Sequence, residues 1–256
     1  MAAVWVWWIY VHHISGGFWT LSDCLLAMPL INVTWDMLFN LNLLRCAKQI
    51  NPLIPAPRMR VAMVTTRAPT EAFDVLKVTL TAMLKQDYPY TYDVWLADEK
   101  PTQEVIEWCQ QNGVHISCRL GVEEYHQAKW PKRTKCKEGN LAYFYDHWGY
   151  KHYDVVAQFD ADHVPDKTYL SACLPAFRDP NVAYVAAPSI CSKGEDQFWS
   201  TRGRLYQDAT FHGVGQAAYY PYWMPTCIGS HYTVRTSHLQ SVRSLPLCSC
   251  STKSEK

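Results

Sequence analysis

Short apolar runs alternate with amphipathic stretches over most of the chain after residue 60, and this pattern predicts alternating β-strands and α-helices. The expected strands are the apolar or β-branched runs at 60–66, 92–98, 114–120, 153–159 and 182–189. The expected helices, whose apolar residues recur at helical spacing, cover 71–86, 102–112, 138–148 and 167–177. This alternation favours an α/β fold with a mostly parallel, Rossmann-like sheet that helices cover on both faces.

Two apolar stretches precede this pattern. Residues 2–21 contain no Asp, Glu, Lys or Arg, and residues 24–44 carry Asp36 as their only formal charge. A helix needs about 20 residues to cross the hydrocarbon core of a bilayer, so each stretch is just long enough. Two spanning helices, or one spanning helix beside an interfacial one, are equally open. We therefore expect 1–44 to be hydrophobic, membrane-associated helices.

A basic, proline-rich segment at 45–59 follows these stretches, and the cations continue to Arg60 with no acid between. Positive charge beside a membrane segment favours the cytoplasmic side, and the prolines favour a stiff linker. We therefore expect the domain at 60–239 to lie on the cytoplasmic face of an inner or plasma membrane. An irregular tail at 240–256 completes the expected organisation.

Composition and charge exclude some functions. The chain has 24 Lys+Arg against 23 Asp+Glu, a net charge of +1, so it lacks the wide basic field that nucleic acid binding uses. Its 10 cysteines show neither C-x-x-C nor zinc-finger spacing and lie scattered through apolar segments. Free thiols in a reducing compartment are therefore expected.

Acidic residues follow two of the predicted strands. Asp98 ends the second strand, and Asp160 and Asp162 come directly after the fourth. Ligands of such sheets bind beyond the carboxyl ends of the strands. In an extended backbone, residues i and i+2 point the same way, so both carboxylates would point at one spot. Two close carboxylates suit Mg²⁺ or Mn²⁺ shared with a substrate phosphate. Taken alone, so short a pattern is better explained by an ordinary strand-end turn that caps a helix.

A basic stretch precedes the predicted helix at 138–148. Residues 130–140 read WPKRTKCKEGN, in which four cations lead into a glycine, an asparagine and a helix start: Lys132, Arg133, Lys135, Lys137, Gly139 and Asn140. Cationic side chains and N–H groups at a helix N-terminus together form an anion cradle. A solvated basic loop is the alternative, which the neighbouring D-x-D makes less favourable.

Taken together and in order, these motifs resemble one enzyme family. The run 60–239 resembles a processive family 2 glycosyltransferase of the cellulose-synthase-like kind, which has a GT-A fold. The resemblance rests on five segments: VLKVTLTAMLKQDYP (75–89), VWLADE (94–99), KEGNL (137–141), FDADHVP (159–165) and CIGSHYTVR (227–235).

The resemblance implies a role for particular residues. Donor binding falls to Thr65, Asp98, Lys137, Gly139, Asn140 and Asp160, with Asp98 holding the uracil. Asp160 and Asp162 would hold Mg²⁺ or Mn²⁺, and the acceptor side would be Gly229, Ser230 and His231. The implied reaction is transfer of a sugar, with inversion, from a nucleotide-sugar donor of the UDP-hexose type to a growing glycan.

The stretch after Leu239 departs from the family pattern. Inverting transfer needs a carboxylate base near the acceptor hydroxyl. The family carries it in an E-D motif about two dozen residues after the CIGSHYTVR-like turn, followed by Q-x-x-R-W. Here the tail contains Glu255 as its one acid. We therefore expect a C-terminally truncated chain that keeps the donor half of the site and transfers little or no sugar.

Other interpretations remain open. One is a non-catalytic, membrane-anchored nucleotide-sugar-binding protein, a pseudoenzyme or partner of other synthase subunits. Another is a phosphatase of the haloacid-dehalogenase type, since DADHV fits D-x-D-x-[TV], although that motif usually lies on a first strand. Five aromatic residues in 197–225 could stack on sugars, lie along a membrane or, as we slightly favour, be core: Trp199, Tyr219, Tyr220, Tyr222 and Trp223.

Overall fold

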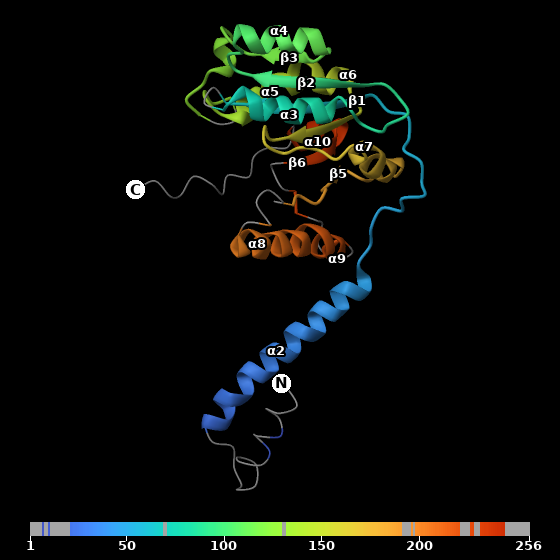
Figure 1. Cartoon of the computed structure of the whole chain (residues 1–256). Helices are drawn as coiled ribbons and strands as arrows, with labels where there is room; N and C mark the ends of the chain where they lie inside the picture. The colour runs from blue at the N-terminus through green and yellow to red at the C-terminus, as the bar shows by residue number, and fades with distance from the viewer. Residues whose placement is uncertain are drawn as a thin grey trace. The chain divides into compact units, whose positions relative to one another are not determined.

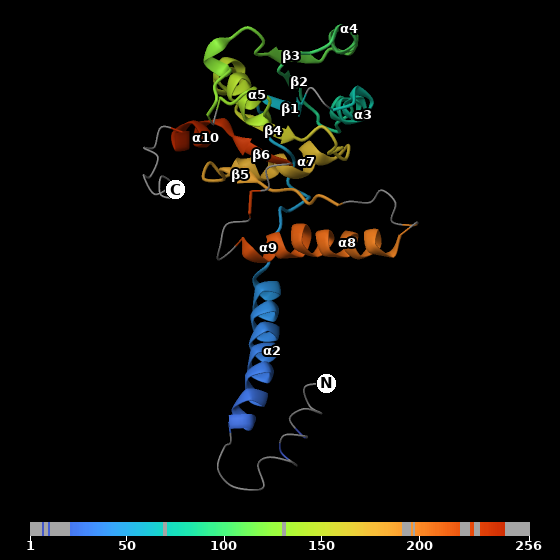
Figure 2. The ribbon, with the colours of Figure 1, turned by 90° about the vertical axis from the view of Figure 1, so that its left-hand side faces the viewer.

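The computed structural model describes residues 7, 10, 21–68, 71–129, 132–190, 196, 198–220, 226–227 and 231–243, with the backbone alone at 21–26 and 243. The chain forms two compact units. The first comprises 1–48 with 214–224, and the second 49–213 with 225–256. Figure 1 labels most of the helices and strands of both units, and Figure 2 also labels β4.

The first unit contains α2 (Leu21–Cys46) and α9 (Gln216–Tyr219), and the backbone N–H of Lys48 donates to the carbonyl of Ala217 at 3.0 Å. Helix α2 covers the second predicted apolar stretch, which confirms a helix there. The first stretch lies outside the described residues except for Trp7, Tyr10 and Leu21, the first residue of α2. Within the described ranges, no helix combines the length and the apolar character that crossing a bilayer requires.

A six-stranded sheet organises the second unit, with the strand order β3-β2-β1-β4-β6-β5. The strands are β1 (Val61–Arg67), β2 (Tyr92–Asp98), β3 (His115–Cys118), β4 (Val155–Phe159), β5 (Tyr184–Val185) and β6 (His231–Arg235). Strands β1 to β4 pair in parallel, whereas β6 runs antiparallel between β4 and β5. The predicted mostly parallel α/β sheet is therefore confirmed.

Helices cover both faces of this sheet, as Figure 2 shows for α3 and α5. One face carries α3 (Phe73–Met83), α4 (Gln103–Asn112) and α7 (Tyr169–Cys173), and the other carries α5 (Lys137–Phe144) and α10 (Thr236–Arg243). The remaining elements are η2 (Glu123–Tyr125), η3 (Tyr145–Gly149), α6 (Tyr150–His152), η4 (Leu174–Arg178), α8 (Trp199–Ala209) and η5 (Thr210–Gly215).

Strand β1 shows why the apolar runs become central strands. All seven of its residues are buried, and neighbours alternate between the two cores. Val61 and Met63 pack with α3, whereas Ala62 and Val64 pack with α5. A strand covered on both faces needs a continuous apolar run, and each fully buried Val or Met contributes about 1.5–3 kcal/mol.

Two predicted elements differ from the structure. The strand expected at 182–189 pairs only through Tyr184 and Val185 of β5. It is an edge strand, and Pro188 lacks the N–H that a longer ladder would use. The helix expected at 138–148 ends at Phe144 and continues as the π-helix η3.

The core interpretation of the aromatic segment is wrong for the residues that the structure describes. Helix α8, which the periodicity did not predict, has no buried residue, and Trp199 is 88% exposed. Tyr219 and Tyr220 are exposed as well, while Tyr222 and Trp223 lie outside the described residues. Stacking on sugars and contact with a membrane both stay predictions.

The described cysteines are free thiols: Cys46, Cys109, Cys118, Cys136, Cys173 and Cys227. Burial raises the pKa of Cys109 to about 11 and that of Cys173 to about 12, so both stay protonated at neutral pH. They pack in the core as small apolar groups.

Candidate functional site

The carboxyl ends of β1, β2 and β4 lie side by side. In the sheet register Arg67 pairs with Asp98, and Thr65 pairs with Phe159, the residue before Asp160. Parallel pairing therefore brings the acidic residues that follow β2 and β4 to one edge of the sheet. Helix α5 begins at this same edge, at Lys137.

A direct contact joins two of the predicted motifs. The Lys137 Nζ atom lies 2.9 Å from Oδ1 and 3.2 Å from Oδ2 of Asp160. Both side chains keep partial access to solvent, with 40% of Lys137 and 27% of Asp160 exposed. The first residue of α5 and the first carboxylate of the D-x-D thus form a cation–carboxylate pair that a ligand can reach.

The D-x-D lies on a turn and not on an extended strand. Strand β4 ends at Phe159, and the His163 N–H donates to the Asp160 carbonyl at 3.1 Å, which closes a four-residue turn. Ala161, between the two aspartates, is buried. The extended-backbone argument for a common direction of the carboxylates is therefore wrong. Asp162 is 74% exposed and contacts His163 Nδ1 at 2.9 Å.

The donor set of this turn fits a hard divalent cation. Asp160 and Asp162 offer carboxylate oxygens, the ligands that Mg²⁺ and Mn²⁺ prefer, and such ions commonly take one or two carboxylates plus substrate phosphates and water. In the described part of the chain, no three His, Cys, Asp or Glu side chains converge as a metal cage.

Asp98 is fully buried and already engaged. Its Oδ2 accepts from Arg67 Nη1 at 3.0 Å, and its Oδ1 accepts from the Lys100 N–H at 2.9 Å. Thr65 is buried as well, and its Oγ1 has no hydrogen-bond partner among the described residues. Both residues form the floor of the site, so their predicted contacts with a donor stay predictions.

Asn140 ties the start of α5 to the strand ends. Its Nδ2 lies 3.3 Å from the carbonyl of Arg67, at the end of β1, and 3.3 Å from the carbonyl of Ala97 in β2. In the first turn of α5, the Glu138 carboxylate accepts from its own backbone N–H, which lowers the pKa of Glu138. The beginning of this helix thus already favours a negative charge.

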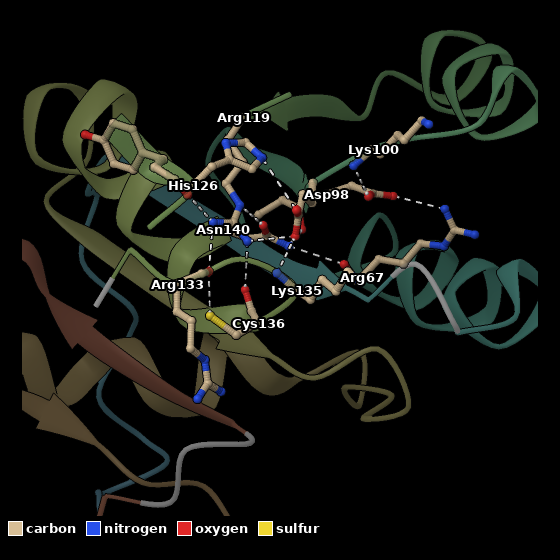
Figure 3. A network of polar contacts seen from close by, with 12 residues as sticks. Arg67, Asp98, Lys100, Arg119, His126, Arg133, Lys135, Cys136 and Asn140 are labelled. Carbon is tan, nitrogen blue, oxygen red and sulfur yellow. Dashed lines mark hydrogen bonds and ion pairs between the residues drawn. The ribbon is translucent and has the colours of Figure 1, made fainter. Parts of the chain in front are cut away.

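A buried arginine lies beneath this helix start. Arg119 is 0% exposed, and Figure 3 shows it surrounded by the strand ends, α5 and the basic loop. Its N–H groups donate to five acceptors: Asn140 Oδ1, Glu99 Oε2 and the carbonyls of Tyr125, Arg133 and Cys136. A guanidinium has five N–H donors, so its hydrogen-bonding capacity is filled.

The close approach of Arg119 to α5 requires a glycine at residue 139. A Cβ at residue 139 would lie 2.2 Å from Arg119 Nη1 and 2.6 Å from the Arg133 carbonyl oxygen. No side chain fits there unless the arginine or the loop moves. The glycine of KEGNL therefore permits close packing.

The substitution Gly139→Ala is expected to lower the free energy of unfolding by about 1–3 kcal/mol, because overpacking displaces bonded groups. Helix propensity alone predicts the opposite, a gain of about 1 kcal/mol. Gly203→Ala in α8 is the matched control, since nothing lies within 4 Å of its Cβ position. Urea unfolding of both variants measures the difference. A Gly139→Ala variant as stable as the control would contradict the steric argument.

Of the predicted acceptor-side residues, Gly229 and Ser230 lie outside the described residues. His231 opens β6 opposite Phe159, and its ring stacks on His163 with 5.4 Å between the ring centroids. Its Nε2 contacts the Ala187 carbonyl, and burial lowers the pKa of the His231 ring. Strand β6 thus lies beside the D-x-D turn.

Sequence reasoning missed three residues of this site: Arg67, Glu99 and Arg119. The available signal was charge at the ends of apolar strands, since Arg67 directly follows the run predicted at 60–66 and Arg119 lies in the run predicted at 114–120. Glu99 adjoins Asp98, and all three lie within the network of Figure 3 or contact it.

A hollow of about 660 Å³ lies elsewhere on the second unit, lined among others by Arg60, Asp93, Tyr153 and Asp154. These residues stand at or near the amino ends of β1, β2 and β4, opposite the edge that carries Asp160. Ligands of parallel α/β sheets bind at the carboxyl edge. The hollow is therefore not the candidate site.

No family model matches the sequence, and no curated protein matches it. The structure is similar to a solved mannosyltransferase, PcManGT from Pyrobaculum calidifontis, in complex with GDP-Man and Mn²⁺. The identity is 16%, the TM-score is 0.58, and the match covers 86% of this chain and 57% of that one. TarS 1–349 from S. aureus also matches, with 12% identity, a TM-score of 0.45 and coverage of 72% and 49%.

The match to the mannosyltransferase shows that the chain has a GT-A-like fold, as expected from the sequence motifs. The match spans 57% of the length of the first solved structure and 49% of the second.

Proposed function

We propose that this protein is a family 2 glycosyltransferase of the cellulose-synthase-like kind, which transfers a hexose with inversion from a UDP-sugar to a glycan acceptor. The carrying observation is the contact of Lys137 with Asp160 at 2.9 Å. It places a cation, a carboxylate and a helix start at the carboxyl edge of the sheet. These are groups that suit a diphosphate and a divalent ion.

The donor diphosphate would lie against the start of α5. Breaking the bond between sugar and phosphate leaves negative charge on the diphosphate, and preorganised cations stabilise that charge. Lys137 is the nearest candidate, and the exposed Arg133 and Lys135 precede it on the same loop. Asn140 and Gly139 hold this helix start against the strand ends, while Thr65 and Asp98 form the floor for the base.

Asp160 and Asp162 would hold Mg²⁺ or Mn²⁺, whose chemistry in this site is to neutralise diphosphate charge. Asp160 already binds one cationic group, the Lys137 ammonium, which supports a site that prefers positive charge. In the donor complex, Lys137 would exchange its carboxylate partner for a phosphate oxygen. Asp160 keeps its place because the turn that closes at His163 fixes its backbone.

A second candidate is a protein that binds the donor without transferring sugar, alone or beside other synthase subunits. It is favoured by the state of His231, the one predicted acceptor-side residue in the described ranges. Its ring is buried and its Nε2 contacts the Ala187 carbonyl, so this nitrogen is not available as a base to an acceptor hydroxyl.

We also propose that residues 1–44 attach the protein to the inner or plasma membrane, with the second unit on the cytoplasmic side. Many apolar side chains of α2 are more than half exposed: Met28, Ile31, Val33, Trp35, Met37, Leu38, Leu41 and Leu44. Such a surface favours contact with lipid. Flotation with liposomes tests this, and a full chain that stays at the bottom of the gradient would contradict it.

Calorimetry with UDP and with GDP tests the function, with Mn²⁺ or EDTA, on the wild type and on Asp162→Ala. We expect Mn²⁺-dependent binding of UDP that is weaker in Asp162→Ala. Release of UDP from a UDP-sugar in the presence of glycan then separates the two candidates, since turnover supports the transferase and binding without turnover supports the binding protein. A wild type that binds neither nucleotide would contradict both.

A further inference from the structure

We infer that Glu99 and Arg119 are positioning residues, which hold the basic loop 133–136 and the start of α5 in the shape that receives the diphosphate. This inference rests on the proposed function. The two residues support the loop that carries the cations and are not themselves proposed as ligands of the diphosphate.

Arg119 fixes the loop through its backbone. Its Nη1 donates to the Arg133 carbonyl at 3.0 Å, and its Nη2 donates to the Cys136 carbonyl at 3.3 Å. These two carbonyls bracket the loop. A buried guanidinium stays charged and needs hydrogen-bond acceptors. If the loop moved away, the Arg119 guanidinium would lose these two acceptors or become exposed to solvent.

Glu99 fixes the middle of the same loop. Its Oε2 accepts from Arg119 Nη2 at 2.9 Å and from the Lys135 N–H at 2.9 Å. Lys135 has a φ of 54°, the left-handed region that residues other than glycine rarely adopt. Such a conformation persists only when surrounding contacts impose it, and the hydrogen bond from Glu99 is one of these contacts.

The loop leads directly into the site. Lys137 follows Cys136 and begins α5, and its Nζ contacts Asp160. Arg119 also binds Asn140 Oδ1, one turn further along α5. The two residues therefore set where the helix starts and where the cation at its start lies.

Charge alone predicts a different outcome, which makes the inference testable. Glu99 is an anion close to a site for an anion, so removing its charge would strengthen diphosphate binding on electrostatic grounds. Positioning predicts that loss of its hydrogen bonds weakens binding. Glu99→Gln keeps an acceptor oxygen without the charge, whereas Glu99→Ala removes both.

The experiment measures the affinity of the full chain for UDP with Mn²⁺ by calorimetry. We expect Glu99→Ala to bind about tenfold more weakly or worse, because small displacements of a binding group carry large costs. Glu99→Gln should stay close to the wild type. Asp154→Asn is the matched control, since it disrupts the Arg60–Asp154 ion pair at the other edge of the sheet and should not change binding.

Hydrogen exchange of the amides at 133–137 is the second readout, and we expect it to be faster in Glu99→Ala. A folded Glu99→Ala that binds UDP as tightly as the wild type, or more tightly, overturns the inference. Should that variant not fold, Arg119→Lys replaces it, with the same expected loss. If the wild type binds no nucleotide, the proposed function fails, and unchanged exchange in Glu99→Ala then overturns the positioning role separately.

Discussion

Replacing Asp160 with alanine is expected to weaken Mn²⁺-dependent UDP binding by about 100-fold or more. Outer-shell partners of metal sites typically contribute about 10–100-fold to affinity, and a direct ligand should reach at least the upper value. Asp160 is also the less exposed of the two aspartates, with 27% of its side chain exposed against 74% for Asp162. Charge interactions are stronger where water is partly excluded.

Without metal, Asp160→Ala is not expected to weaken UDP binding. Lys137 loses its two contacts with Asp160 in Asp160→Ala, so this carboxylate no longer competes with a diphosphate oxygen for the ammonium. UDP binding in EDTA should therefore be kept or strengthened, while binding in Mn²⁺ falls. Calorimetry under both conditions measures this pair of changes.

Asp166→Ala serves as the control, because this exposed aspartate lies on the same loop and its Oδ1 accepts from the N–H and Oγ1 of Thr168. It should bind UDP like the wild type under both conditions. An equal loss in Mn²⁺ and in EDTA for Asp160→Ala would mean that the residue acts on folding and not on a metal.

The fold was predictable because its central strands are buried on both faces. The run 92–98 is β2 residue for residue, and the helix predicted at 102–112 is α4 with Gly113 as its left-handed cap. The hydrophobic pattern failed to predict elements that bury few or no side chains. Strand β5 lies at the edge with two paired residues, and α8 forms although it buries no side chain, so apolar spacing carried no information about either.

The site was predictable only where a short motif marks it. KEGNL and FDADHVP identified Lys137 and Asp160, which are in contact. The ion pairs that support them were not predictable, because Arg67 and Asp98 meet through the parallel register, and Arg119 meets Glu99 from the end of the next strand. The spacing of residues along the chain does not reveal which strands pair or in which register. The turn at Asp160 was missed because the sequence does not show where β4 ends.

Asp98→Ala is expected to lower the free energy of unfolding by about 3–5 kcal/mol, the range found when one partner of a buried ion pair is removed. Arg67 and Asp98 have 8% and 0% of their side chains exposed, so the buried guanidinium would stay charged without its carboxylate partner and keep only the Glu71 carbonyl as an acceptor among the described residues. The Lys100 N–H would lose its acceptor as well. Urea unfolding measures the change, and a loss below about 1 kcal/mol would show that the pair behaves as a surface contact.

The double variant Arg67→Met with Asp98→Ala separates stability from donor binding. Replacing both members of a buried pair by apolar groups is often neutral, so we expect most of the lost stability to return. If Asp98 holds the donor base, the stable double variant still binds UDP weakly. If Asp98 serves only to pair Arg67, UDP affinity returns together with stability. The buried and fully engaged carboxylate makes this comparison the direct test of its predicted role.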